Sequence, residues 1–178
     1  MIETARLILR PFRDADRDAF AALNGDPRVS DWLGGPIDRR ASDAALDRVT
    51  SHIAEHGFGF WAAERKADAR LIGMIGLMRL QADLPPSPAV EIGWRLSPDA
   101  WGQGFASEGG AAALAWGFEH LDIDEIIAIT AVDNRRSQRV MQRIGMVEQP
   151  GRAFDHPHLP VDHPLRRHVL YAAGRACA

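Results

Sequence analysis

Apolar and polar positions alternate along the chain in short blocks that predict strands. Residues 6–10 alternate and predict a first strand, which Pro11 ends. Two apolar runs, 58–64 and 71–80, flank a polar connection of turn length, so we expect them to form an antiparallel hairpin. Residues 126–132 are rich in β-branched side chains without alternation, which is typical of a strand buried on both faces. Further strands are expected at 90–96, 146–148 and 167–172.

Apolar residues spaced three and four positions apart predict helices between these strands. Asp14 is expected to cap a helix that runs through Leu23, and Ser42 or Asp43 to cap a second helix that runs through His56. Two more helices are expected, one ending near residue 121 and one over 136–144, with loops at 24–36 and 154–164. This order of strands and helices predicts an α/β (α+β) fold in a single domain spanning residues 1–178.

Composition and charge narrow the class of protein. Hydrophobic residues make up 46% of the 178 residues and charged residues 25%, which is ordinary for a globular domain. The net charge of −3 gives no sign of a nucleic-acid partner. We expect no membrane-spanning helix and no signal peptide, because the apolar runs are short and the first residues lack a basic region followed by an apolar one.

Cysteine usage adds one expectation about the compartment. Cys177 is the single cysteine, so it has no partner for an internal disulfide, and we expect a protein of the reducing cytoplasm. Chains fray at their ends, which makes Cys177 a poor candidate for a catalytic nucleophile.

The strongest candidate for a binding site is the glycine-rich segment Trp101-Gly102-Gln103-Gly104-Phe105-Ala106-Ser107-Glu108. It follows the strand expected at 90–96 and opens a helix made of small residues. The first backbone N–H groups of a helix have no partner within the helix, and the helix dipole adds partial positive charge at the same end. A glycine-rich turn in this position is therefore expected to bind the phosphate groups of a ligand.

Three known kinds of segment contain a glycine-rich turn of this sort. A Walker A loop requires a lysine after its second glycine, and the single lysine, Lys66, lies far upstream. A dinucleotide fingerprint requires a third glycine where Ser107 stands, and an acid after the next strand, whereas Asp122, Asp124 and Glu125 precede that strand. The third kind is a turn that merely joins a strand to a helix, and the glycines alone do not exclude it.

Two neighbouring features favour phosphate binding. The helix after the turn contains Gly109, Gly110 and Gly117, and each helical glycine costs about 1 kcal/mol relative to alanine, which implies that a sheet or a ligand approaches the backbone closely. A matching element follows downstream, where the segment from Val132 to Met146 begins as a turn after a buried strand and continues as a short helix.

Together these residues resemble the GCN5-related N-acetyltransferases (GNAT superfamily) and, within it, the RimJ/RimL-like ribosomal-protein N-terminal acetyltransferases. The pyrophosphate loop of that superfamily reads Arg/Gln-x-x-Gly-x-Gly/Ala, and here it is Trp101-Gly102-Gln103-Gly104-Phe105-Ala106. Trp101 departs from the general pattern but looks like this branch, and since the loop works through backbone N–H groups we expect phosphate binding to survive. The resemblance also covers residues 3–11, 71–77, 90–94 and 168–171.

The resemblance implies an acyl-CoA N-acyltransferase fold, in which a mixed, mostly antiparallel sheet is flanked by helices and splayed at its centre, between strands 93–96 and 126–132. It also implies acetyl-CoA as co-substrate, with the pantetheine arm paired to the open backbone edge. Arg136, Arg139 or Arg143 would meet its adenosine phosphates, unless they are simply solvated. The cofactor-binding residues expected on this basis are Trp94, Arg95, Leu96, Trp101, Gly102, Gln103, Gly104, Phe105, Ala106, Ser107, Asn134, Ser137 and Met141.

Acetyl transfer by direct attack in a ternary complex needs an amine that has lost its proton, a donor for the oxyanion and an acid for the departing thiolate. We expect a backbone N–H near residues 94–96 to be the oxyanion donor. Many relatives place a tyrosine acid where Met141 stands, so Ser137, one turn earlier, is the substitute candidate, or else a serine that only touches the cofactor. Glu91 is the candidate base, acting through water, or else an ordinary cross-strand carboxylate.

The resemblance places one wall of the acceptor site at the loop around Trp32, and His158 is the candidate on a second loop. Both residues are expected to bind substrate, which would be a primary amine of a protein N-terminus, a peptide or a small molecule. The segment His156-Pro157-His158 has no cysteine or carboxylate pair at a recognised ligand spacing, so no metal is expected.

Two alternatives remain open at this point. An aminoglycoside- or polyamine-type acetyltransferase of the same fold would need a strongly acidic cleft, and no acidic cluster stands out in either proposed wall. A non-catalytic acyl-CoA sensor would explain the missing tyrosine at Met141. The sequence also does not decide between a monomer and a homodimer.

Overall fold

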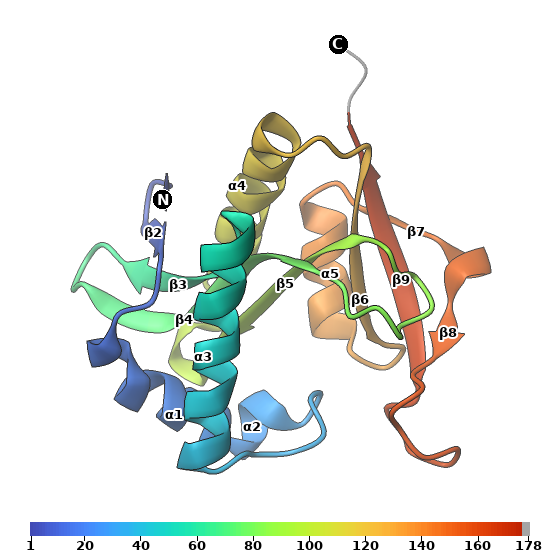
Figure 1. The fold of residues 1–178 in the computed structure, drawn as a ribbon, viewed down its shortest axis with the longest axis horizontal. Helices are drawn as coiled ribbons and strands as arrows, with labels where there is room; N and C mark the ends of the chain where they lie inside the picture. Colours follow the sequence, from blue (N-terminus) through green and yellow to red (C-terminus); the bar gives the residue numbers. More distant parts are fainter. Residues whose placement is uncertain (176–178) are drawn as a thin grey trace.

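The computed structural model describes residues 1–175 and shows, within that range, a nine-stranded mixed sheet with helices on both faces (Figure 1). The predicted α/β (α+β) class is confirmed. The strands are β1 (Ile2–Glu3), β2 (Leu7–Arg10), β3 (Phe60–Arg65), β4 (Arg70–Arg79), β5 (Val90–Leu96), β6 (Glu125–Ala131), β7 (Val147–Glu148), β8 (Phe154–Asp155) and β9 (Arg167–Gly174). The helices are α1 (Arg17–Gly25), α2 (Pro27–Ser30), α3 (Arg39–His56), α4 (Phe105–His120) and α5 (Arg135–Arg143). Cys177 lies outside the described residues.

Strands β1 to β5 form an antiparallel half of the sheet in chain order. The expected hairpin is confirmed, because β3 and β4 pair antiparallel, with Phe60 opposite Gly76. Strand β5 pairs antiparallel with β4 along its whole length, from Val90 to Leu96. The register places Glu91 opposite Met78, in the centre of the sheet.

The sheet parts at its centre, between β5 and β6. These two strands run parallel and pair at a single position, Glu91 with Ile127. Figure 1 shows the two strands diverging beyond that point, with β5 continuing into the left half of the sheet and β6 into the right half. The expected splay is confirmed, and it leaves the β6-facing edge of β5 without a partner strand for most of its length.

The right half of the sheet is built around β9. Strand β6 pairs antiparallel with β9 from Glu125 to Ala131, and β9 carries the short strands β7 and β8 on its other side. Strand β8 lies within the segment expected to be a loop at 154–164, and β1 was not predicted. Both strands have two residues, which is too short to show a period of two in the sequence.

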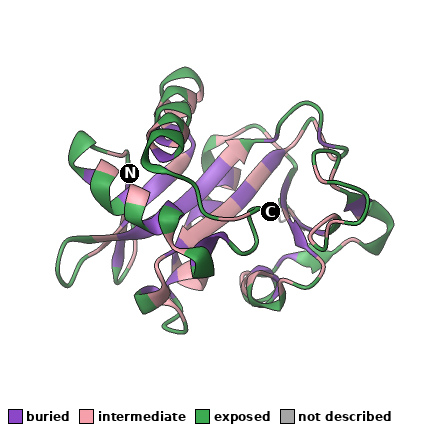
Figure 2. Cartoon of the chain, turned by 90° about the horizontal axis from the view of Figure 1, so that it is seen from below, coloured by how far each residue is buried: buried purple, intermediate pink, exposed green. Residues whose placement is uncertain are grey.

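Helices α1 and α3 cover one face of the sheet. Phe20, Leu23 and Leu46 from these helices pack on Met74 of β4 and form a cluster of their own. Figure 2 shows the pattern as buried strands lying beneath helices whose outer sides are exposed. None of the helices within residues 1–175 combines the length and apolar character needed to cross a bilayer.

Helix α4 lies on the other face, and its small residues let it approach the sheet closely. A Cβ atom on Gly109 would lie 2.5 Å from Cδ1 of Ile75, and one on Gly117 would lie 2.7 Å from side chains of Leu77 and Ile126. At these two glycines the close approach expected from the sequence is made by the sheet.

The start of the first helix differs from the prediction. Asp14 begins a 3-10 turn that ends at Asp16, and α1 begins at Arg17. The carboxylate of Asp16 accepts a hydrogen bond from the backbone N–H of Arg13 (2.7 Å), which fixes the entry of the chain into the turn. Asp14, the expected cap, is exposed and pairs with Arg17 instead, and no side chain caps the first turn of α1.

The start of α3, which is the second helix expected from the sequence, was also predicted wrongly. Helix α3 begins at Arg39 and is capped by Asp38, whose carboxylate accepts the backbone N–H of Ala41 (2.8 Å). Ser42 and Asp43, the two expected caps, both lie inside the helix. Ser42 is buried, and its hydroxyl accepts a hydrogen bond from Nδ2 of Asn24 (2.8 Å), while Asp43 pairs with Arg39. The serine therefore joins α3 to the end of α1.

The loop expected at 24–36 contains the short helix α2. Pro27 occupies its first turn, and the carboxylate of Asp26 accepts the backbone N–H of Arg28 (2.9 Å) as an N-cap. Proline at the first helical position and aspartate before it are a common start for a helix, so the signal was present in the sequence.

A buried ion network joins the first strand to the helix entry. The guanidinium of Arg10 donates to both carboxylate oxygens of Asp16 (2.7 and 3.0 Å) and to Glu64 of β3 (2.7 Å). Arg10 and Asp16 are 5% and 7% exposed. Burial acts to raise the pKa of Asp16, but hydrogen bonds from Arg10 and from the N–H of Arg13 outweigh it, and the net pKa is lowered.

We expect Asp16→Asn to lower the free energy of unfolding at pH 7 by about 2–4 kcal/mol, because it leaves a buried cation with one acidic partner instead of two. A folded-state pKa below the unfolded value means that the contribution of Asp16 is present above about pH 4 and is lost as pH falls through the folded pKa. Urea unfolding between pH 3 and 7 measures both effects. The control is Asp14→Asn, which removes an exposed pair with Arg17 and should change the free energy of unfolding by about 0–1 kcal/mol.

Candidate active site

The glycine-rich turn has a backbone that only glycine adopts readily. Gly102 has φ 73° and Gly104 has φ 83°, both in the left-handed region. Gly104 is the N-cap of α4, and no side chain caps this end of the helix. The first helical hydrogen bond is donated by the N–H of Glu108 to the carbonyl of Gly104 (2.9 Å). The N–H groups of the preceding turn are therefore free to bind a ligand at the positive end of a 16-residue helix.

Arg6 holds this turn in place. Its Nε donates to Glu108 (2.6 Å), its Nη1 donates to the carbonyl of Gln103 (2.9 Å), and its guanidinium carbon lies 4.5 Å from the centre of the Phe105 ring. The hydroxyl of Thr4 also donates to Glu108 (2.6 Å). The sequence singled out the turn but gave no signal for Arg6, because the two segments are about a hundred positions apart.

The glycine-rich turn together with the N-terminus of α4, called the pyrophosphate corner below, fits a diphosphate. Burial acts to raise the pKa of Glu108, but hydrogen bonds from Thr4 and Arg6 outweigh it, so the net pKa is lowered and the carboxylate is balanced by the guanidinium of Arg6. The hydroxyl of Ser107 is buried and has no hydrogen-bond partner within residues 1–175. An unpartnered hydroxyl beside free N–H groups is a set of donors that an anion would satisfy. The pyrophosphate of coenzyme A has the charge and the acceptors that this set requires.

The last residues of β5 contribute mainly their backbone to the corner. Trp94 lies 3.6 Å from the Cβ position of Gly110 and packs on α4. Leu96 is 6% exposed, and its carbonyl accepts a hydrogen bond from the indole N–H of Trp101 (2.8 Å). The guanidinium carbon of Arg136 lies over the Trp101 ring, 5.1 Å from the centre of the ring. This contact brings the start of α5 next to the turn.

The three residues near α5 that are expected to bind the cofactor have different environments. Asn134 caps the helix, since its Oδ1 accepts the N–H of Ser137 (3.2 Å) and its Nδ2 donates to Thr130 (3.0 Å). Ser137 is half-buried. Met141 is 1% exposed and belongs to the main hydrophobic core. The vacant acid position is therefore filled by core packing, and Ser137 stays the candidate for a side chain that reaches the leaving group.

Glu91 stands at the one point where β5 and β6 pair. Burial raises the pKa of its carboxyl to about 7, and within residues 1–175 no hydrogen bond contributes to that shift. Glu91 as a whole residue is half-buried rather than sealed in the core, which is compatible with access of water from the gap between β5 and β6. A carboxyl with a pKa near neutral can accept a proton at physiological pH, which suits a general base acting through water.

Trp32 lines a cavity of about 480 Å³. The cavity is open to solvent and lies between α2, the glycine turn and the start of α5. Its lining residues are Arg28, Asp31, Trp32, Trp101, Asp133, Arg135 and Arg136. Trp32 is 37% exposed. The structure thus brings the predicted acceptor loop beside two predicted cofactor elements, which the sequence places far apart.

His158 lies on the loop after β8 and contacts another loop. Its Nε2 lies 2.5 Å from the carboxylate of Asp83, which holds the pKa of that carboxyl below its usual range. Its ring is also 5.3 Å from that of His156. In the part of the chain that the structure describes, no group of three histidine, cysteine or acidic side chains is placed to hold a metal ion.

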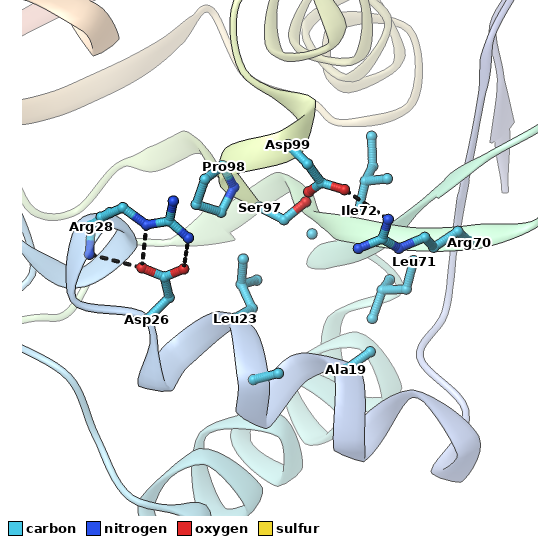
Figure 3. Close-up of a pocket in the computed structure, with 12 residues that line it drawn as sticks. Ala19, Leu23, Asp26, Arg28, Arg70, Leu71, Ile72, Ser97, Pro98 and Asp99 are labelled. Carbon is cyan, nitrogen blue, oxygen red and sulfur yellow. Dashed lines mark hydrogen bonds and ion pairs between the residues drawn. The ribbon is translucent and has the colours of Figure 1, made fainter.

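A second cavity, of about 610 Å³, was not predicted (Figure 3). It lies between α1, the start of β4 and the turn after β5. Figure 3 shows two ion pairs on its walls, Asp26 with Arg28 (2.6 Å) and Arg70 with Asp99 (2.7 Å). Because these charges neutralise each other, the cavity offers a ligand no unbalanced charge from either pair.

The splayed sheet and the open N-terminus of α4 beside it define the acyl-CoA N-acyltransferase fold. A sequence model described as the acetyltransferase (GNAT) domain matches residues 6–147. The chain therefore belongs to the GNAT acetyltransferase family, and it is an N-acetyltransferase.

Individual relatives agree with this family. The chain is 30% identical over 154 residues to the uncharacterized N-acetyltransferase YoaA of Bacillus subtilis, covering 84% of each chain. It is 30% identical over 152 residues to the FsC-acetyl coenzyme A-N(2)-transacetylase of Aspergillus fumigatus, covering 82% of this chain and 64% of that protein. A GNAT-family acetyltransferase of Bacillus anthracis has a similar fold, with a TM-score of 0.81 at 23% identity and 98% of each chain covered.

Proposed function

We propose that the protein transfers the acetyl group of acetyl-CoA to a primary amine by direct attack in a ternary complex, as a RimJ/RimL-like enzyme of the cytoplasm. The observation that carries this proposal is the gap between β5 and β6, which pair only at Glu91 and Ile127, directly before the free N-terminus of α4. The gap offers an open backbone edge to the pantetheine arm, and the helix offers donors to the phosphates.

The residues that bind the pyrophosphate and take part in the acetyl transfer have separate roles in this proposal. The N–H groups of Gly102 to Ser107 hold the pyrophosphate, with Arg6 keeping their turn in shape. When bound, acetyl-CoA supplies an activated thioester. Glu91 removes a proton from the acceptor amine through water, and a backbone N–H near residues 94–96 donates to the developing oxyanion. Ser137 supports the departing thiolate through a hydrogen bond.

The relatives support the identity of the acetyl donor more than the identity of the amine that accepts the acetyl group. The name of the Aspergillus relative includes acetyl coenzyme A, and that relative is 30% identical to this chain. The acceptor named there belongs to that protein. A protein N-terminus, a peptide and a small amine all remain within the proposal for this chain.

Thiol release tests the proposal. Purified protein, acetyl-CoA and a panel of peptides, amino acids, polyamines and aminoglycosides are expected to give free CoA with at least one amine. Acetyl-CoA binding is measured separately by calorimetry. Binding without turnover on the whole panel would favour the non-catalytic sensor, and an absence of binding would contradict the site itself.

A further inference from the structure

The face of β5 that looks away from α4 carries Glu91, Gly93 and Arg95. Side chains alternate along a strand, so these three share one face, while Trp94 and Leu96 lie on the α4 side. A Cβ on Gly93 would lie 3.0 Å from the ring of Phe60, which shows that this face borders the half of the sheet covered by α1 and α3.

Arg95 reaches from this face to the end of α1. Its Nη1 donates to Oδ1 of Asn24, and the backbone carbonyl of Asn24 accepts the N–H of Ile37 (3.2 Å) at the end of the Trp32 loop. The guanidinium therefore lies at the end of α1, next to the start of the segment that contains the proposed acceptor wall. The pyrophosphate corner, by contrast, is built at the N-terminus of α4, on the other side of the strand.

The charge of Arg95 is not balanced by any acidic side chain within residues 1–175. Its polar contact is to the neutral amide of Asn24, and its Nε is buried without a hydrogen-bond partner. Burial lowers its pKa to about 10. Arg10, a buried arginine on strand β2, differs from Arg95 because it donates to the carboxylates of both Asp16 and Glu64.

A buried cation without a counter-ion is costly, and arginine in particular presents a planar set of donors that matches a carboxylate. Arg95 as a whole is half-buried, although its Nε is fully buried, so the residue is open to a ligand on one side that can supply the missing partner. Glu91 stands four positions away on the same face, about 13 Å along an extended strand. An acceptor would thus meet an acid at one end of this face and a cation at the other.

We propose that Arg95 binds an anionic group of the acceptor, so that the preferred substrates are amines that also carry a carboxylate, such as peptides or longer amino acids, rather than polyamines. This inference rests on the proposed function, because it names the class of acceptor for the same site. The carboxylate lies several bonds from the amine, as the separation of Arg95 and Glu91 requires.

Matched acceptors test the inference. Each pair has the same primary amine and differs at one end, as in a tripeptide with a free C-terminus and the same tripeptide amide. We expect the wild-type protein to have a kcat/KM for the free carboxylate about 10- to 100-fold higher than for the amide, which is the range for a charged hydrogen-bonded pair. In Arg95→Gln this preference should fall below about 3-fold, with the Kd for acetyl-CoA unchanged.

A second variant tests the carboxylate preference without changing Arg95 itself. Asn24→Asp places a carboxylate where Arg95 already has its contact, and so supplies an internal counter-ion. It should lower the carboxylate preference as Arg95→Gln does. The matched control is Arg79→Gln, which removes an exposed arginine from the neighbouring strand β4 and should leave the preference intact.

Binding to the complex with CoA separates this inference from the proposed function. Calorimetric titration of each acceptor into protein saturated with CoA needs no turnover. Arg95-dependent binding of carboxylates without acetylation would support the inference and contradict the transferase mechanism. Two outcomes would overturn this inference and leave the proposed function standing. One is acetylation of amines with no carboxylate preference, and the other is a carboxylate preference that persists in Arg95→Gln. A change confined to the Kd for acetyl-CoA would assign Arg95 to the cofactor and also overturn it.

Discussion

Gly104→Val is expected to reduce the affinity for acetyl-CoA by at least about 100-fold, since two or three hydrogen bonds to a charged phosphate contribute roughly 1.5–3 kcal/mol each. Gly104 has φ 83°, where a β-branched residue is strained, and a Cβ there would lie 3.4 Å from the guanidinium of Arg6. The distance to Arg6 is an ordinary van der Waals contact, so the strain comes from the backbone. The turn must shift to relieve that strain, and its N–H groups then no longer point to one place. Calorimetry with acetyl-CoA measures the loss.

The matched control is Gly57→Val. Gly57 ends α3 at φ 78° and has open space at its Cβ position, so the variant introduces the same backbone strain far from the glycine turn. Both variants should lose about 1–2 kcal/mol of stability, the cost of a left-handed conformation. If Gly104→Val binds acetyl-CoA as tightly as Gly57→Val does, the phosphate site is not at this turn.

Glu91→Gln is expected to lower kcat by about 10²- to 10⁴-fold, the usual contribution of a general base. Burial raises the pKa of Glu91 to about 7, and only the deprotonated carboxylate can take a proton from the amine. The wild-type rate should therefore rise with pH through about 7. In Glu91→Gln that rise should disappear, while the affinity for acetyl-CoA stays the same.

The same substitution should stabilise the fold. A carboxyl whose folded pKa is raised to about 7 binds a proton that the unfolded chain has released, so its contribution is full below about pH 4 and is lost as pH rises through about 7. At pH 8 the glutamine variant should gain about 1–2 kcal/mol, a figure reduced for the partial access of water to this side chain. Urea unfolding at pH 8 measures the gain.

Glu91→Ala serves as a second variant for this residue. It removes the carboxylate and leaves space, so a small carboxylate such as formate should restore part of its activity in a concentration-dependent way. Full activity in Glu91→Gln, or an unchanged pH profile, would show that Glu91 is an ordinary carboxylate of the sheet and that the base is another group.

The glycine turn itself was predictable because its signal is local. Gly102 and Gly104 adopt left-handed conformations that glycine favours, and they stand between a strand and a helix that both have clear apolar periods. Met141 shows the limit of the same approach. The sequence marked it as the place of a missing acid, but only its burial at 1% exposure showed that core packing fills the position.

The order of amino acids was enough to specify the elements with long periods, the glycine turn and the family, because each depends on residues adjacent in the chain. Contacts between distant segments settled the remaining features. They joined Asp16 to the buried guanidinium of Arg10, placed Arg6 against the glycine turn, and left Arg95 without an acidic partner among residues 1–175. The physical reason is that propensity and hydrophobic period act over a few residues, whereas charge balance and burial are properties of surfaces brought together by the sheet.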